Sequence, residues 1–266
     1  MTTGRGALRK AEWLFGFDFD STLADPERGD QVDKLFFKTL DVIEQKVNFA
    51  WGICTGRSLE HIIEGLEKFS IPRWPHYLVT QERDIFYLDA VGGYQPDECY
   101  NTKAREALSF ELSQNEDVID LIREYVITQT KGQWISIEGE PAGVVAEDES
   151  QISHIVDLIE QFESKTSHLD YQRNSIYLRL THQAYSKGSA LQYIQRQYSL
   201  KPNKSVTVGD NLNDFSMLHA NVARYFGVPK NGHKSLMKRV VDQGGIISTF
   251  NYAQGVSDIL NRIGVV

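Results

Sequence analysis

The sequence predicts an α/β protein in which a parallel sheet, with helices on both faces, is interrupted by an inserted α+β domain. Two observations support this prediction. Short apolar runs alternate with helical repeats in both terminal parts of the chain, whereas hairpin-like strands and long helical repeats fill the middle. Alternating strands and helices are typical of a parallel sheet, in which sites collect at the carboxyl ends of the strands.

The first terminal part has the order strand, helix, strand, helix, strand. Each predicted strand is a short apolar, β-prone run, and each helix has apolar residues three and four positions apart. Ser58 is a suitable N-cap for the second helix because its hydroxyl can accept a backbone N–H. The elements are expected at residues 14–19, 32–43, 49–54, 59–66 and 77–79.

The alternation resumes after residue 187. A helix through Leu191 and Ile194 precedes a strand at 205–208, which ends in Gly209-Asp210. The remaining expected elements are a helix at 215–219, strands near Tyr225 and Ile246, and a last helix after Gln254.

We interpret residues 81–182 as the inserted domain and residues 1–80 and 183–266 as the core. The insert is expected to contain a hairpin-like strand at 85–88, paired strands at 134–138 and 176–180, and helices near 103–128 and 150–164.

Composition excludes several functional classes. The net charge of −8 and the isoelectric point of about 5.4 argue against nucleic acid as a main partner, which needs a basic surface. No apolar run approaches the roughly 20 residues of a membrane span, and no signal-peptide core follows the N-terminus. The two cysteines, Cys54 and Cys99, are interpreted as reduced thiols, so a cytoplasmic location is expected.

Asp18-Phe19-Asp20 places two carboxylates directly after the first predicted strand. One carboxylate can attack phosphorus while the other moves a proton, since a carboxylate is a competent nucleophile for phosphoryl transfer. Taken alone, the pair also fits a solvated turn after a strand.

Gly209-Asp210-Asn211-Leu212-Asn213-Asp214 supplies two more carboxylates at another strand end. Oxygen ligands of this kind suit Mg²⁺. Taken alone, the segment also fits an Asx-rich turn with a helix N-cap. Four carboxylates that converge without a cation would repel one another, which favours the metal site.

Two further segments carry groups suited to an anion. Thr55-Gly56 combines a hydroxyl with a backbone that a ligand can approach closely, next to a helix N-terminus that attracts anions. Lys187-Gly188 puts a cation at a helix start, which is electrostatically unfavourable unless an anion lies opposite. A simple helix cap and a solvated lysine are the alternatives.

Together these segments resemble the four motifs of the haloacid dehalogenase superfamily. The ordered set is Asp18-Phe19-Asp20-Ser21-Thr22, Thr55-Gly56-Arg57-Ser58, Lys187-Gly188 and the 209–214 segment. The insert resembles a type II cap, and the chain is similar to sucrose-phosphate phosphatase and related sugar-phosphate phosphatases. Two positions depart from the pattern: many type II members have glycine in place of Ser21 and a glycine-containing turn in place of residues 81–84.

The resemblance implies a Rossmann-like core, a cap that supplies specificity, and a Mg²⁺-dependent phosphatase. Asp18 would be the nucleophile and Asp20 the acid and base. Thr55, Gly56, Lys187 and Asn213 would bind the phosphate, with Thr55 and Lys187 also counted as catalytic. Mg²⁺ would be held by Asp18, the backbone carbonyl of Asp20, Asp210 and Asp214.

The expected substrate is a small phosphorylated metabolite, such as sucrose 6-phosphate, and neither nucleic acid nor a membrane is an expected partner. A phosphosugar mutase, a non-catalytic phosphosugar-binding protein and a protein or nucleotide phosphatase are alternatives. In the insert, Trp134, Glu138, Arg173 and Asn174 have groups that suit a sugar. We favour a core position for Trp134 and solvated positions for the others.

Overall fold

The computed structural model describes residues 3–25, 29, 31–137, 140–162 and 168–264. The chain divides into two compact units. The larger contains Met1–Asn101 and Lys187–Val266, and the smaller contains Thr102–Ser186. Among the described residues, no helix combines the length and the apolarity needed to cross a membrane.

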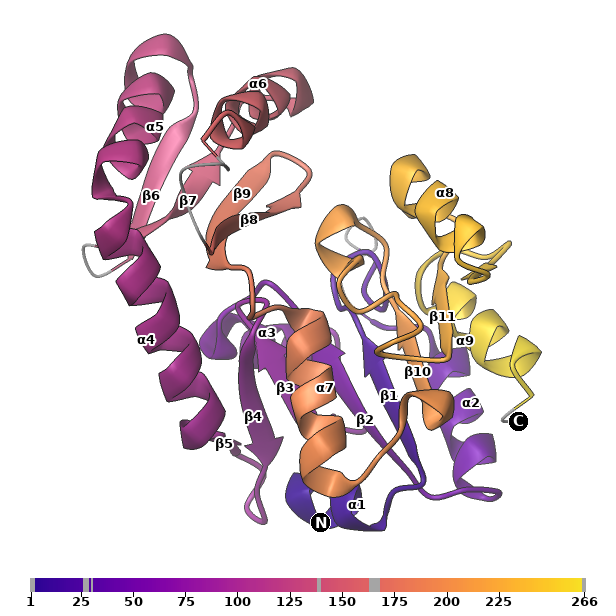
Figure 1. Cartoon of the computed structure of the whole chain (residues 1–266). Helices are drawn as coiled ribbons and strands as arrows, with labels where there is room; N and C mark the ends of the chain where they lie inside the picture. Colours follow the sequence, from indigo (N-terminus) through magenta and orange to yellow (C-terminus); the bar gives the residue numbers. More distant parts are fainter. Residues whose placement is uncertain (1–2, 26–28, 30, 138–139, 163–167, 265–266) are drawn as a thin grey trace. The chain divides into compact units, whose positions relative to one another are not determined.

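The larger unit contains an eight-stranded sheet in the order β12-β11-β10-β1-β2-β3-β4-β5. The strands from β12 to β3 pair in parallel, and β4 and β5 are antiparallel additions. Figure 1 shows the central strands side by side. The bounds are β1 (Trp13–Phe17), β2 (Phe49–Cys54), β3 (Tyr77–Thr80), β4 (Asp84–Leu88), β5 (Tyr94–Pro96), β10 (Ser205–Val208), β11 (Tyr225–Val228) and β12 (Ile246–Ile247).

Helices cover both faces of this sheet. Phe15 and Phe17 of β1 lie in one buried cluster with residues of α2, α3 and α9. The intervening Gly16 faces Leu191 of α7, because successive strand positions point to opposite faces. The helices of the larger unit are α1 (Gly4–Lys10), α2 (Lys34–Glu44), α3 (Leu59–Lys68), α7 (Lys187–Tyr198), α8 (Lys234–Asp242), α9 (Tyr252–Arg262) and the first turn of α4 (Glu98–Gln114).

The sheet has a topological switch point between β1 and β10. From β1 the chain proceeds through β2 to β3 on one side, and later from β10 through β11 to β12 on the other. The crevice at the carboxyl ends of such a strand pair is where α/β sheets bind ligands. The order of the strands therefore locates the expected site between Asp18 and Asp210.

The predicted α/β class is confirmed, but several elements differ from expectation. Strand β4 and its neighbour β5 pair with the core sheet, although residues 81–101 were assigned to the insert. The helix expected at 215–219 is wrong, since turns follow a 3₁₀ turn at Leu212–Asp214. Helix α8 and strand β5 had no counterpart in the prediction.

The smaller unit is an α+β structure with its own core. Its sheet has the order β6-β7-β9-β8, so the expected pairing of 134–138 with 176–180 is wrong because β7 lies between them.

Trp134 packs against the buried cluster as expected, and Glu138 lies outside the described residues. The elements are the rest of α4, α5 (Glu116–Gln129), β6 (Gln133–Ile137), β7 (Glu140–Val145), α6 (Glu149–Glu160), β8 (Leu169–Asn174) and β9 (Tyr177–His182).

Candidate active site

The residues singled out in the core motifs lie at the carboxyl ends of neighbouring central strands of the large sheet. Asp18 directly follows β1, and its N–H donates to the carbonyl of Val208 in β10 at 2.9 Å. Thr55 directly follows β2, and Asp210 follows β10 after Gly209. Because these strands are parallel and adjacent, their carboxyl ends bring the three side chains to one place.

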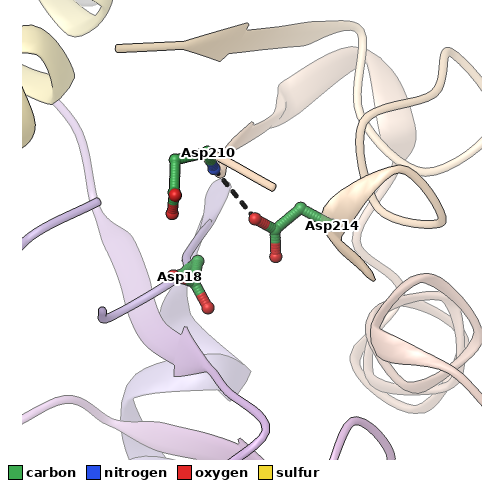
Figure 2. Close-up of side chains that lie close together, drawn as sticks. All are labelled: Asp18, Asp210 and Asp214. Carbon is green, nitrogen blue, oxygen red and sulfur yellow. Dashed lines mark hydrogen bonds between the residues drawn. The ribbon is translucent and has the colours of Figure 1, made fainter. Parts of the chain in front are cut away.

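Asp18, Asp210 and Asp214 form a cluster of buried carboxylates (Figure 2). One oxygen from each lies within 4.8 Å of the other two. Burial raises the pKa of Asp18, and its two acidic neighbours raise it further against the opposing effect of Lys187. Burial and then Asp214 raise the pKa of Asp210 to about 7. A cation among these carboxylates would therefore reduce their mutual repulsion.

Asp214 is held by the loop that it helps to build. Its Oδ2 accepts hydrogen bonds from the backbone N–H groups of Asp210 at 2.8 Å and Asn211 at 3.0 Å. The side chain of Asn211 in turn completes a capping box with this 3₁₀ turn. These bonds direct Oδ1 of Asp214 toward Lys187, at 2.6 Å.

Gly209 is required by the position of Asp214. A β-carbon at residue 209 would lie 2.4 Å from Cγ of Asp214, which is too close for two non-bonded carbon atoms. We expect Gly209→Ala to displace this carboxylate and to weaken Mg²⁺ binding by about tenfold or more, in the range reported for perturbed ligand support. Isothermal titration with MgCl₂ measures the change. Unaltered Mg²⁺ affinity in a folded variant would show that Asp214 does not contribute to a metal site.

Lys187, the first residue of α7, is fully buried among carboxylates. Its ammonium lies 2.8 Å from Asp18 Oδ1 and 3.6 Å from Glu82 Oε2, in addition to its contact with Asp214. Burial lowers the pKa of Lys187, but these three carboxylates outweigh burial and raise the pKa well above its usual range. The carboxylates thus favour the charged form of Lys187, which lies beside Asp18.

Asp20 lies apart from the carboxylate cluster. Its two oxygens accept hydrogen bonds from Arg57, at 2.7 Å from Nε and 2.6 Å from Nη2. This bidentate pair is partly exposed, and the hydrogen bond with Asp20 raises the pKa of Arg57. The side chain of Asp20 is thus placed next to the site without joining the cluster, and its expected contribution to a metal is through its backbone carbonyl.

The groups expected to bind phosphate follow the same central strands. They are Thr55 and Gly56 after β2, and Asn213 in the loop after β10. Thr55 is buried, and its Oγ1 accepts the N–H of Arg57 at 3.1 Å. Asn213 is buried, and its Nδ2 donates to Glu82 Oε1 at 3.0 Å. A β-carbon on Gly56 would lie 2.7 Å from the same Glu82 oxygen. The expected phosphate-binding groups therefore adjoin one another around Glu82.

Three residues of this site had no role in the sequence analysis. Thr22 donates to Asp210 Oδ1 at 2.7 Å, and Arg57 binds Asp20. Both occur inside the quoted motifs, so their position next to the acidic residues was a signal. Glu82 belongs to none of the motifs, and the only sequence signal was that residues 81–84 stand where many type II members have a glycine-containing turn.

The donor set fits a magnesium ion. Three buried carboxylates converge, and burial, followed by repulsion from their acidic neighbours, raises the pKa values of Asp18 and Asp210. Oxygen ligands with few protein carboxylates are typical of Mg²⁺.

Stabilisation by Mg²⁺ should depend on pH. An Asp pKa raised to about 7 in the folded, metal-free protein contributes stability that is full below the ordinary value of 3.8 and is lost as the pH rises through 7. Mg²⁺ must also displace the proton of Asp210 at low pH. We expect Mg²⁺ to raise Tm more at pH 8 than at pH 6, by at least about twofold, in thermal unfolding with MgCl₂ or EDTA. An equal increase at both values, or a larger one at pH 6, would contradict the titration of Asp210.

The sequence matches the profile of the haloacid dehalogenase-like hydrolase family over residues 15–260. The chain therefore belongs to this family, and the resemblance inferred from the motifs is confirmed. No curated protein sequence matched the chain.

Several solved structures share the fold. The chain resembles the sucrose-phosphatase of Synechocystis sp. PCC6803, solved with sucrose and phosphate, with a TM-score of 0.73 and 18% identity over 95% of this chain and 98% of that one. The chain also resembles the sugar phosphatase BT4131 of subclass IIB, with a TM-score of 0.66 and 13% identity over 96% of this chain and 100% of that one. For the phosphatase BT1666 of Bacteroides thetaiotaomicron, the TM-score is 0.64 and the identity is 17% over 97% of both chains.

Proposed function

We propose that this protein is a Mg²⁺-dependent phosphatase that hydrolyses a small phosphate monoester through a phosphorylated Asp18. The observation that supports this most strongly is the contact of Lys187 with both Asp18 and Asp214, beside a third buried carboxylate, Asp210. Binding alone does not require a buried nucleophile with a neighbouring acid and base. The family and the sugar phosphatases among the structural neighbours support a sugar phosphate, such as sucrose 6-phosphate, as the substrate.

In the first step, a carboxylate oxygen of Asp18 forms a bond to phosphorus as the bond to the ester oxygen breaks. The leaving oxygen takes a proton from Asp20. In the second step, Asp20 removes a proton from water, the water oxygen bonds to phosphorus, and the acyl phosphate bond breaks to regenerate Asp18 and release phosphate. One carboxyl group thus acts in turn as acid and base.

Asp20 has to exchange its bonds to Arg57 during this cycle. These bonds occupy both oxygens of Asp20, and one oxygen has to be free to exchange a proton with the leaving oxygen and then with water. Lys187 and the groups near Thr55 and Asn213 would hold the phosphoryl oxygens, since positioning and electrostatic stabilisation dominate phosphoryl transfer. Mg²⁺, held by Asp18, Asp210, Asp214 and the Asp20 carbonyl, would offset the charge between nucleophile and phosphate.

The experiment is phosphate release from a panel of esters in MgCl₂ and in EDTA. The panel contains sucrose 6-phosphate, trehalose 6-phosphate, hexose phosphates and nucleotides. We expect Mg²⁺-dependent release that is concentrated on a sugar phosphate. Isomerised substrate without free phosphate would indicate a mutase, and binding without turnover of any ester would indicate a non-catalytic binder; either result contradicts the proposal.

A further inference from the structure

Glu82 occupies an unusual position beside the site. It follows β3 in a turn where Gln81 and Glu82 have φ values of 48° and 69°. Such left-handed backbone is uncommon for residues other than glycine, asparagine and aspartate. Hydrogen bonds hold the turn, from the N–H of Gln81 to Arg57 O at 2.9 Å and from the N–H of Glu82 to Thr55 O at 3.0 Å. The turn thus fixes a carboxylate against the segment that contains Thr55 and Gly56.

The side chain of Glu82 is buried and points to the proposed phosphate-binding groups. It is 5% exposed, and a charged residue with so little exposure needs strong partners. Its Oε1 accepts from Asn213 Nδ2 at 3.0 Å, and its Oε2 lies 3.6 Å from Lys187 Nζ. No catalytic step described above uses this carboxylate.

A carboxylate determines the orientation of a neighbouring amide. An ionised Glu accepts hydrogen bonds but cannot donate them, so only the NH₂ end of Asn213 can face it. The opposite orientation would place the amide oxygen against the carboxylate and remove a buried hydrogen bond, which leaves both oxygens without a donor. Within the described residues, Oδ1 of Asn213 has no hydrogen-bond partner that could hold the amide from its other end.

Gly56 provides an independent sign that Glu82 belongs to the site. A side chain at residue 56 would collide with Glu82 Oε1, at 2.7 Å from the β-carbon. The carboxylate therefore lies directly over one of the groups assigned to the phosphate, in addition to its bond with Asn213.

We propose that Glu82 is a positioning residue that acts through Asn213: it fixes the amide of Asn213 so that the phosphate-binding groups are arranged before the substrate arrives. This proposal rests on the function proposed above. Pre-arranged groups reduce the ordering that binding requires, so the effect should fall mainly on substrate affinity.

The test is a double-mutant cycle with Glu82→Ala, Asn213→Ala and the combined variant. We expect Glu82→Ala to raise KM by about tenfold or more and to change kcat by less than about threefold, because an interaction made with both substrate and transition state affects binding. In the Asn213→Ala background, the same change should alter kcat/KM by less than about twofold, since coupled residues are not additive. An equal loss in both backgrounds, tighter phosphate binding, or no loss would overturn the proposal.

Two further variants separate positioning from stability. Glu82→Gln retains an acceptor for Asn213 Nδ2, so we expect it to restore part of the affinity and to remain folded if the alanine variant does not. Asp97→Asn changes another buried carboxylate of the larger unit, which accepts from Tyr193 at 3.2 Å and from the N–H of Tyr100 at 3.1 Å. It should alter Tm without changing KM.

Calorimetric titration with inorganic phosphate in MgCl₂ distinguishes failure of this proposal from failure of the proposed function. If the wild-type protein hydrolyses no ester but loses phosphate affinity by about tenfold on Glu82→Ala, the positioning role stands and the phosphatase function does not. Equal phosphate affinity in the two proteins, or no phosphate binding by the wild type, overturns the positioning role.

Discussion

Replacing Asp18 with asparagine should reduce kcat by at least about 10⁴-fold, the scale at which enzymes lose rate when a nucleophile is removed. An amide has nearly the shape of the carboxylate but is a poor nucleophile toward phosphorus. Lys187 retains Asp214 and Glu82 as partners in the variant. We therefore expect a normal circular dichroism spectrum and a well-defined thermal transition.

Phosphate release under saturating substrate measures this effect. Asp41→Asn is a matched control, because Asp41 belongs to α2, outside the motifs, and its side chain is 64% exposed. The control should retain wild-type turnover. Turnover of Asp18→Asn near that of the wild type, with the fold intact, would end the assignment of the nucleophile.

Replacing Lys187 with methionine should have the second-largest effect, on both activity and stability. Removing one partner of a buried ion pair typically costs about 3–5 kcal/mol, and here Asp18, Asp214 and Glu82 would all lose their cation. A loss of this size lowers Tm by roughly 6–20 °C in a protein of this length. We expect kcat/KM to fall by at least about 10³-fold, because the phosphate and the nucleophile both lose electrostatic support.

Thermal unfolding in EDTA and in MgCl₂ measures the stability of this variant. Mg²⁺ should recover part of the loss, since it supplies positive charge to the same carboxylates. Lys131→Met serves as the control, because Lys131 pairs with Glu147 at the surface with 78% of its side chain exposed, and its Tm should be unchanged. A variant at position 187 that is as stable as the wild type in EDTA would contradict the charge balance described for the site.

The sequence alone was sufficient to predict that Asp18, Thr55 and Asp210 would meet. Each follows an apolar run that forms a central strand, and parallel neighbours bring their carboxyl ends together. The sequence also indicated that Lys187 faces negative charge, since a lysine at a helix start needs an anion opposite it. Its three carboxylate partners satisfy that requirement.

The remaining features depend on tertiary contacts that no local pattern encodes. Met217 and Leu218 are fully buried and apolar, which resembles a helix face. The segment instead forms turns, and Thr207 donates to the carbonyl of Met217 at 2.8 Å in place of a helical partner. Strand β4 was assigned to the insert because a hairpin pattern does not reveal which sheet it joins.

The two departures from the family pattern fall on left-handed backbone. Ser21 has a φ of 61°, and Gln81 and Glu82 have values of 48° and 69°. These segments thus adopt left-handed backbone with residues that lack the freedom of glycine. Side-chain contacts compensate at residue 82, whose carboxylate bonds to Asn213. The resemblance to the family marked these positions as departures, but only the fold reveals the contact.

Trapping the covalent intermediate tests the central claim most directly. The protein is mixed with the ester that it hydrolyses best, quenched in acid within one turnover and reduced with borohydride, which converts an aspartyl phosphate to homoserine. Peptide mass spectrometry should then find homoserine at position 18 in the wild-type protein and not in Asp18→Asn. An active enzyme that gives no homoserine, or gives it at another aspartate, would contradict hydrolysis through a phosphorylated Asp18.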